Sequence, residues 1–122
     1  MPATWTRENL AWLAGLFEGE GCISTHQGKT GRAYWILQIQ MTDEDVVRRA
    51  AEVAGAGMVT GPYSSRRENR KPQWAWRACK RGDVYALLVA LWPWLRTRRR
   101  ARAREALLAL PPVIRKGCRP CV

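Results

Sequence analysis

Residues 13–21 read Leu-Ala-Gly-Leu-Phe-Glu-Gly-Glu-Gly, and this stretch decides the fold of the 122-residue chain. Apolar residues recur at steps of three and four from Leu10 to Phe17, a pattern that predicts a helix. Thr6 is a suitable residue to cap that helix at its amino end. Glycines surround Glu18 and Glu20, so the helix is predicted to end there, with both acids at its carboxyl end.

The two glutamates sit where a helix carries partial negative charge, so their own charge is unfavourable there. A bound cation would remove the conflict. Mg²⁺ suits the position because it takes oxygen ligands, needs only one or two carboxylates and keeps water molecules for chemistry. The alternative is an ordinary amphipathic helix that ends in a solvated acidic turn.

Charge predicts a polyanionic partner. The chain carries 21 Lys and Arg against 10 Asp and Glu, a net charge of +11. Nucleic acid is favoured over a membrane, because the most apolar run, from Val84 to Leu95, is too short to span a bilayer and contains Pro93. We expect neither a membrane nor a small-molecule substrate as a partner. The alternative is that the charge serves solubility alone.

Nothing at the amino end predicts a signal peptide, so a cytoplasmic protein with reduced thiols is expected. The four cysteines are Cys22, Cys79, Cys118 and Cys121. Cys118 and Cys121 form half a zinc site at most, since no second pair stands at a useful spacing. Inert cysteines are therefore expected.

Further elements follow from the alternation of residue types. Strands are predicted at 22–26, 33–41, 57–65 and 73–80. Thr42 is predicted to cap a helix that stops at Gly55, a further helix starts at Asp83, and a last helix covers 94–110 after Pro93. In the second strand Trp35, Leu37, Ile39 and Met41 alternate with Tyr34, Ile36, Gln38 and Gln40. This alternation predicts a sheet with helices on one face only.

Two features of the second half bear on function. Trp74 and Trp76 share one face of their strand and are predicted to lie in the core; the alternative is a stacking platform for single-stranded nucleic acid. Residues 96–104 contain six arginines, which a single helix face cannot hold. Some of them are expected to meet phosphates or the acids of the site.

The stretch at 13–21 resembles the LAGLIDADG motif of homing endonucleases. Eight of nine positions match if Glu is accepted for Asp and Gly for the middle Ala. The predicted order helix, strand, strand, helix, strand, strand, helices is also the order of that family's core, over about 6–110. The resemblance implies an α+β fold, a four-stranded antiparallel sheet with helices on one face. The chain length predicts a single domain, at 1–112, followed by a basic tail at 113–122.

The resemblance further implies a site-specific double-strand DNA endonuclease, encoded by a mobile element or phage and acting in a bacterial or phage-infected cell. With one motif, the chain would act as a homodimer. Metal-dependent hydrolysis would leave 3′ overhangs, with Mg²⁺ as the cofactor and Ca²⁺ or Mn²⁺ as substitutes. Glu20, with Gly19 beside it, would hold the metal, and Glu18 would be mainly structural. Asp43 and Arg98 would complete the catalytic set, with Arg96 as the fallback. The alternatives are that Asp43 only caps a helix and Arg98 only contacts a phosphate.

The resemblance also assigns an interface to each face of the domain. Strand parity places toward the major groove Ser24, His26, Tyr34, Ile36, Gln38, Gln40, Thr60, Pro62, Ser64, Ala75 and Arg77. Phosphates or outer bases would be reached by Lys29, Arg32, Arg66, Arg67, Arg70, Lys71, Arg96 and Arg100. The dimer seam would contain Leu10, Leu13, Ala14, Phe17 and Glu18.

Two other functions stay open. One is a catalytically inactive DNA- or RNA-binding protein on the same fold, a transcriptional regulator or an intron maturase; the acid at position 20 favours the enzyme. The other is a single-strand binder that uses Trp74 and Trp76.

Overall fold

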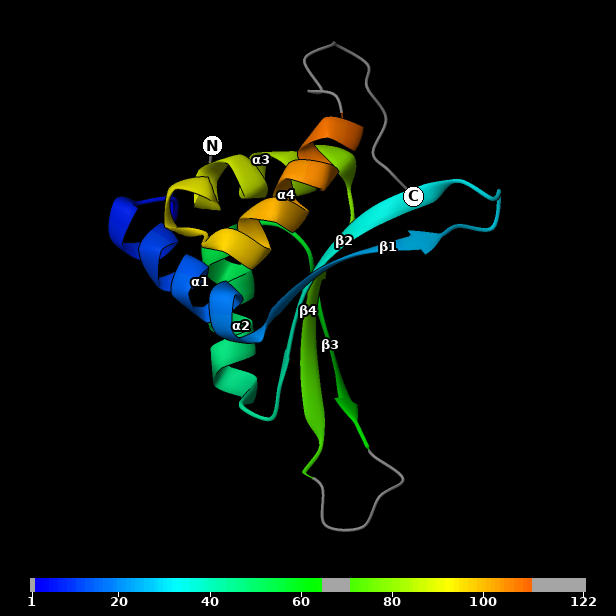
Figure 1. The fold of residues 1–122 in the computed structure, drawn as a ribbon. Coiled ribbons are helices and arrows are strands. Elements are labelled where there is room, and N and C mark those ends of the chain that lie inside the picture. Colours follow the sequence, from blue (N-terminus) through cyan, green and yellow to red (C-terminus); the bar gives the residue numbers. More distant parts are fainter. Residues whose placement is uncertain (1, 65–70, 111–122) are drawn as a thin grey trace.

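A computed structural model describes residues 2–64 and 71–110 (Figure 1). Its elements are α1 (Arg7–Glu20), β1 (Gly21–Gln27), β2 (Ala33–Met41), α2 (Glu44–Ala54), β3 (Met58–Tyr63), β4 (Gln73–Ala78), α3 (Arg81–Leu91), the 3-10 turn η1 (Trp92–Trp94) and α4 (Thr97–Ala109). The four strands pair antiparallel in the order β1-β2-β4-β3. Helices cover one face of the sheet, and the two hairpins point away from them in different directions (Figure 1). The predicted α+β fold is confirmed.

The first helix forms as its sequence predicts. The Thr6 hydroxyl accepts a hydrogen bond from the Asn9 backbone N–H at 3.2 Å, which satisfies a donor left free at the helix start. At the other end the Gly21 N–H donates to the carbonyl of Phe17. A Cβ on Gly21 would lie 2.4 Å from both the ring and the carbonyl oxygen of Phe17, so only glycine fits where the helix turns into β1.

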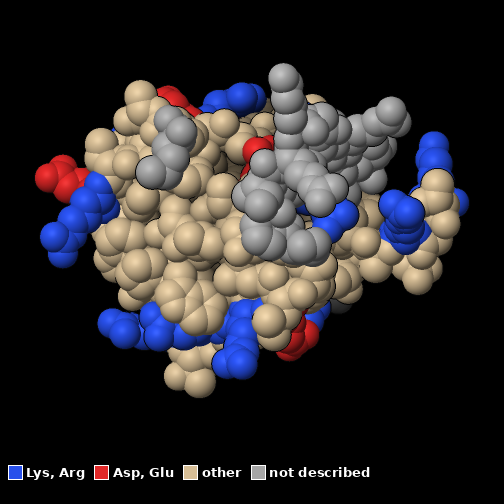
Figure 2. All heavy atoms as spheres, turned by 90° about the horizontal axis from the view of Figure 1, so that it is seen from above, with Lys and Arg blue, Asp and Glu red and all other residues tan. Residues whose placement is uncertain are grey.

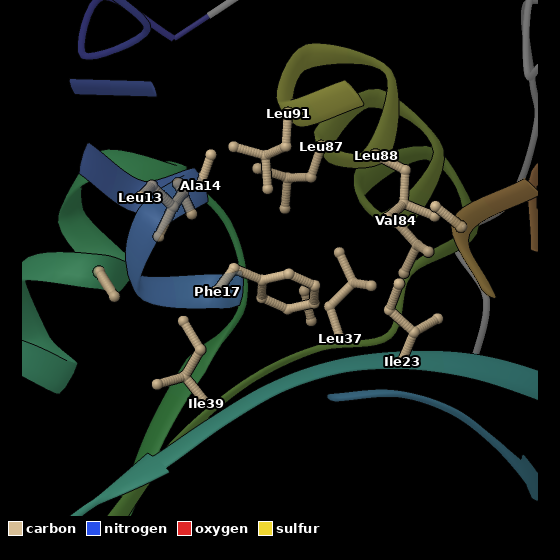
Figure 3. Close-up of a cluster of buried hydrophobic side chains, with 14 of the residues drawn as sticks. Leu13, Ala14, Phe17, Ile23, Leu37, Ile39, Val84, Leu87, Leu88 and Leu91 are labelled. Atoms are coloured by element: carbon tan, nitrogen blue, oxygen red, sulfur yellow. The ribbon is translucent and has the colours of Figure 1, made fainter. Parts of the chain in front are cut away.

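The core lies between the helices and one face of the sheet. Leu13 and Phe17 of α1 point toward Leu37 and Ile39 of β2, and α3 closes the cluster with Leu87 and its neighbours (Figure 3). These side chains have no exposed surface. Each buried side chain of this size contributes about 1.5–3 kcal/mol relative to exposure. The motif helix is therefore held chiefly by its apolar side, and its acidic end is left at the surface.

The two tryptophans of β4 differ in burial. Trp76 is 1% exposed and its Nε1 donates to the Ala56 carbonyl at 2.9 Å, so its predicted core position is confirmed. Trp74 is only partly buried and packs at the core's edge, with the Arg48 guanidinium 5.2 Å from its ring. A stacking platform formed by both rings is excluded, because Trp76 offers no free face.

Several predicted boundaries were wrong by a few residues. Asp43, not Thr42, is the N-cap of α2, and α3 begins at Arg81 rather than Asp83. The last helix begins at Thr97 because Pro93 lies in the 3-10 turn, which the Leu95 N–H closes onto the Trp92 carbonyl at 3.1 Å. The last two strands along the chain, β3 and β4, are shorter than predicted at 57–65 and 73–80.

No helix in the described ranges is both long and apolar enough to cross a membrane. The proposed tail at 113–122, with Cys118 and Cys121, lies outside the described residues, as do Arg66, Arg67 and Arg70.

Candidate functional site

The two motif glutamates occupy different environments at the end of α1. The half-buried Glu18 accepts a hydrogen bond through Oε1 from the backbone N–H of Arg96, the N-cap residue of α4. Arg99 Nε donates to the Phe17 carbonyl at 3.3 Å, so α4 is tied to this end of α1 twice. Glu20 is exposed, and within residues 2–64 and 71–110 no donor pairs with its carboxylate. Glu18 is used inside the chain, and Glu20 is available to a ligand.

Glu20 alone offers a metal ion one carboxylate, so a complete metal site would need ligands from outside this chain. Across the described part of the chain, no group of three or more His, Cys, Asp and Glu side chains could hold a metal ion. One exposed carboxylate suits Mg²⁺, which is commonly held by one or two carboxylates with water and substrate phosphates as its other ligands. A second copy of this chain and a phosphodiester could supply what a single copy does not.

Of the other predicted catalytic residues, Arg98 lies near the motif. Arg98 is exposed in the first turn of α4 and lines a surface pocket with Gly21, the residue that follows Glu20. Arg99, Arg102 and Glu105 line the same pocket, and Glu105 pairs with Arg102 at 2.7 Å. With Arg98, three arginines and one glutamate give this wall a net positive charge. Asp43 does not line this pocket. Asp43 is exposed and its carboxylate makes no capping hydrogen bond, so it is free to hold a water molecule.

Besides Arg99, two more arginines of α4 are engaged inside the chain. Arg100 stacks on Trp92 at 4.9 Å and donates to the Trp92 carbonyl at 3.0 Å, so the predicted DNA contact of Arg100 would have to share or replace these contacts. Arg102 stacks on Trp35 at 4.7 Å and donates to the Ile23 carbonyl at 3.1 Å. Sequence reasoning missed these roles because nothing local to the arginine run indicates its distant partners. Arg96 and Arg98 remain exposed at the start of α4.

The face of the sheet away from the helices carries a row of polar side chains. The strand register places Gln38 opposite Arg77, Gln40 opposite Ala75, and Thr60 on the other side of Ala75. On the neighbouring strand Ser24 lies opposite Ile36, and His26 opposite Tyr34 with ring centroids 6.1 Å apart. Ile36 and Ala75 share this face and are buried.

Four of these side chains form a continuous hydrogen-bonded chain, which we call the polar relay. Arg77 Nε donates to Gln38 Oε1 at 2.8 Å, Gln38 Nε2 to Gln40 Oε1 at 3.1 Å, and Gln40 Nε2 to Gln73 Oε1 at 2.6 Å. Gln73 was missed in the sequence. Its position at the start of β4, two and four residues before Ala75 and Arg77, was the available signal.

The outer strand departs from simple alternation. The register shifts between Thr60 and Tyr63, and Tyr63 lies opposite Gln73. The Tyr63 hydroxyl is 2.6 Å from the Thr60 hydroxyl, so Tyr63 shares the polar face. Counting by twos predicted Pro62 and Ser64 there instead, and that parity was wrong because of the irregularity. Ser64 is exposed just beyond the end of β3.

Basic side chains collect at the hairpin ends. Lys29 and Arg32 are exposed at the turn between β1 and β2, and Figure 2 shows a basic cluster at that end of the molecule, on the right. Lys71 is exposed before β4. The polar face is thus continuous with a basic tip, an arrangement that suits a groove flanked by phosphates.

The predicted dimer seam needs correction. Leu13, Ala14 and Phe17 have no exposed surface and belong to this chain's own core (Figure 3). Leu10 and Glu18 are half-buried. The outward side of α1 instead carries Trp12, which is 40% exposed, together with Gly15 and Gly19. A Cβ on either glycine would meet no atom within 4 Å, so this strip is open for a close partner.

Comparison with known proteins places these features in context. The sequence profile of the LAGLIDADG-like domain family matches residues 7–105. A search of curated proteins found no match.

Solved structures with a similar fold include homing endonucleases. One is I-CvuI in complex with its target in the presence of Ca, with 20% identity, a TM-score of 0.70, and coverage of 84% of this chain and 66% of that one. I-TnaI has 21% identity, a TM-score of 0.62, and coverage of 83% and 70%. The meganuclease I-AabMI bound to uncleaved DNA has 20% identity, a TM-score of 0.60, and coverage of 75% and 32%. The chain therefore spans slightly less than two thirds of I-CvuI and about a third of I-AabMI.

Proposed function

The chain belongs to the LAGLIDADG-like domain family, and from this premise we propose that it is a site-specific double-strand DNA endonuclease that acts as a homodimer. The observation that carries the proposal is the exposed carboxylate of Glu20, which has no partner among the described residues and directly precedes Gly21, a residue of the pocket that Arg98 lines. The polar sheet face and the net charge of +11 supply a matching DNA surface. Structures of I-CvuI and I-AabMI contain uncleaved DNA, in agreement with this partner.

The outward strip of α1 supports the homodimer. Gly15 and Gly19 stand four residues apart on one side of the helix, so two such helices could approach closely with Trp12 at the margin. A twofold axis through this strip would make the contact self-complementary. It would also bring together the two copies of Glu20, which lie at the same end of the two helices.

In the proposed reaction each residue of the chain has a defined task. Glu20 of each copy would hold a divalent metal ion, with the Gly19 backbone beside it; bound Mg²⁺ would supply an activated water and polarise the scissile phosphate. Arg98 would stabilise the negative charge that develops on the phosphate, because a guanidinium keeps its positive charge. For the same reason Arg98 would not act as a proton donor. Asp43 would order a water molecule. The products would be 5′-phosphate and 3′-hydroxyl ends on short 3′ overhangs.

The polar face of the sheet would lie in the major groove, and the basic tips would contact phosphates. Base contacts are proposed for Ser24, His26, Tyr34, Gln38, Gln40, Thr60 and Arg77. Phosphate or outer-base contacts are proposed for Lys29, Arg32, Lys71 and Arg96, and for Arg66, Arg67 and Arg70 outside the described residues. One domain at 1–112 would suffice for this, with 113–122 as an appended tail. A mobile element or phage is the proposed origin, and the cytoplasm of the bacterial host the proposed place of action.

The second candidate is a regulator or maturase that binds nucleic acid without cutting it. It is favoured by one observation, the Glu at position 20 where the motif has Asp. The longer side chain would shift the position of a bound metal ion relative to the scissile phosphate. The test is incubation of wild type and Glu20→Gln with a randomised duplex library, in Mg²⁺ and in Ca²⁺, followed by sequencing of the ends. Discrete cuts that require Mg²⁺ and vanish in the variant support the nuclease. Selective binding without cuts in either metal supports the second candidate.

A further inference from the structure

The polar relay has a fixed direction. An arginine can only donate hydrogen bonds, so the Gln38 amide must turn its oxygen toward Arg77 and its nitrogen toward Gln40. The Gln40 amide follows, with its oxygen toward Gln38 and its nitrogen toward Gln73. One guanidinium therefore sets the orientation of two carboxamides that would otherwise be free to flip.

The backbone below the relay is well placed to keep it in register. Arg77 and Gln38 are direct partners across β2 and β4, the two central strands of the sheet. Gln40 lies opposite Ala75, whose small side chain leaves room for Gln40 to reach Gln73. Central strands are paired on both sides, so this part of the face is more rigid than the hairpin turns.

The groups that the relay leaves unused form a defined pattern. Arg77 keeps the N–H groups of both terminal nitrogens, the pair that matches O6 and N7 of guanine. Gln38 and Gln40 each keep one N–H and one oxygen lone pair. A donor beside an acceptor matches N7 and the N6 amino group of adenine.

Building on the proposed function, we infer that the polar relay reads purines as one coupled unit, with a guanine at Arg77 and adenines at Gln38 and Gln40. In the relay Gln38 Nε2 and Gln40 Oε1 lie 3.1 Å apart, which is close to the rise of about 3.4 Å per base pair. Two adenines read by the bonded amides are therefore on neighbouring base pairs. Loss of Arg77 frees both amides to flip, so it weakens the preference for adenine as well as for guanine.

The first experiment tests the relay without DNA. The side-chain amide resonances of Gln38, Gln40 and Gln73 are assigned in ¹⁵N-labelled protein and compared among wild type, Arg77→Ala and Arg104→Ala. Arg104 is the matched control because it is exposed on α4 and carries the same charge. The Gln38 and Gln40 signals are expected to move in Arg77→Ala only. If they stay unchanged, the relay inference fails and the proposed function is untouched.

The second experiment tests base reading by binding selection from a randomised duplex library in Ca²⁺, which needs no cleavage. Wild type, Arg77→Ala, Gln38→Ala and the double variant form a double-mutant cycle. Arg77→Lys keeps the positive charge but lacks the paired N–H donors of the guanidinium. Wild type is expected to select the guanine and both adenines. Arg77→Ala should lower the adenine preference at the Gln38 position by about threefold or more, and the two losses should not add.

Two outcomes of the selection count against the inference in different ways. Additive losses, each confined to one base position, would remove the coupling and leave sequence-specific DNA binding intact. If wild type enriches no sequence at all, both the base reading and the proposed function are refuted.

Discussion

Glu18, near the end of α1, accepts a hydrogen bond from the backbone N–H of Arg96 at the start of α4. The bond joins segments 78 residues apart in the sequence and fixes the helix that bears Arg98 against the helix that bears Glu20. The two motif acids thus have separate roles: Glu18 joins α1 to α4, and Glu20 is exposed to solvent.

We expect Glu18→Ala to lower the free energy of unfolding by about 1–2 kcal/mol, because the Arg96 N–H loses a charged acceptor. Glu18→Gln should retain most of the stability, since the amide oxygen can still accept. Glu20→Gln is the control and should change stability by less than about 0.5 kcal/mol, as its carboxylate has no partner among the described residues. Urea denaturation of the three variants measures these differences. Equal losses of unfolding free energy at Glu18 and Glu20 would contradict a structural role that belongs to Glu18 alone.

The second prediction separates the core side of α1 from its open side. Gly15→Leu and Gly19→Leu should leave the fold intact, because a Cβ at either position meets no atom within 4 Å. Either change should push two α1 helices apart and yield a monomer in analytical ultracentrifugation. Ala14→Leu is the contrast: Ala14 is fully buried, so the larger side chain should overpack the core and cost about 1–3 kcal/mol. A dimer that survives at both glycines would refute this seam.

The sequence predicted the motif helix and the order of elements because their signals are local. Thr6, the spacing of Leu13 and Phe17, and the alternation in β2 each act within a few residues. The side of α1 that packs against the core is not decided by a local signal. Leu13, Ala14 and Phe17 form one apolar strip, but Trp12, Gly15 and Leu16 form a second, and only the packed sheet shows which is covered. The register shift after Thr60 and the partners of Arg100 and Arg102 likewise depend on distant segments.

The third prediction concerns the arginine-rich helix. Arg102→Ala should destabilise the fold by about 1–2 kcal/mol, because it removes the stacking on Trp35 and the hydrogen bond to the Ile23 carbonyl. Arg104→Ala, two residues on, removes the same charge from an exposed position and should be neutral within about 0.5 kcal/mol. Thermal denaturation of both variants decides the matter. If both are neutral, the contacts of Arg102 contribute nothing measurable.

The last prediction concerns the basic tip. Lys29 and Arg32 are proposed to contact phosphates, and each such contact contributes about 0.9 to the slope of log K against log salt. The double variant Lys29→Ala/Arg32→Ala should therefore reduce the magnitude of that slope by about 1.8 per protomer for duplex binding, measured by fluorescence anisotropy in Ca²⁺. Arg48→Ala/Arg49→Ala is the charge-matched control, since these arginines lie on α2 and pair with Glu44 and Glu52. The control should shift the slope much less, because α2 lies on the other side of the sheet. Equal changes of the slope in both double variants would mean that DNA binding depends only on the total charge of the protein. That result would contradict the proposal that the sheet face lies in the major groove.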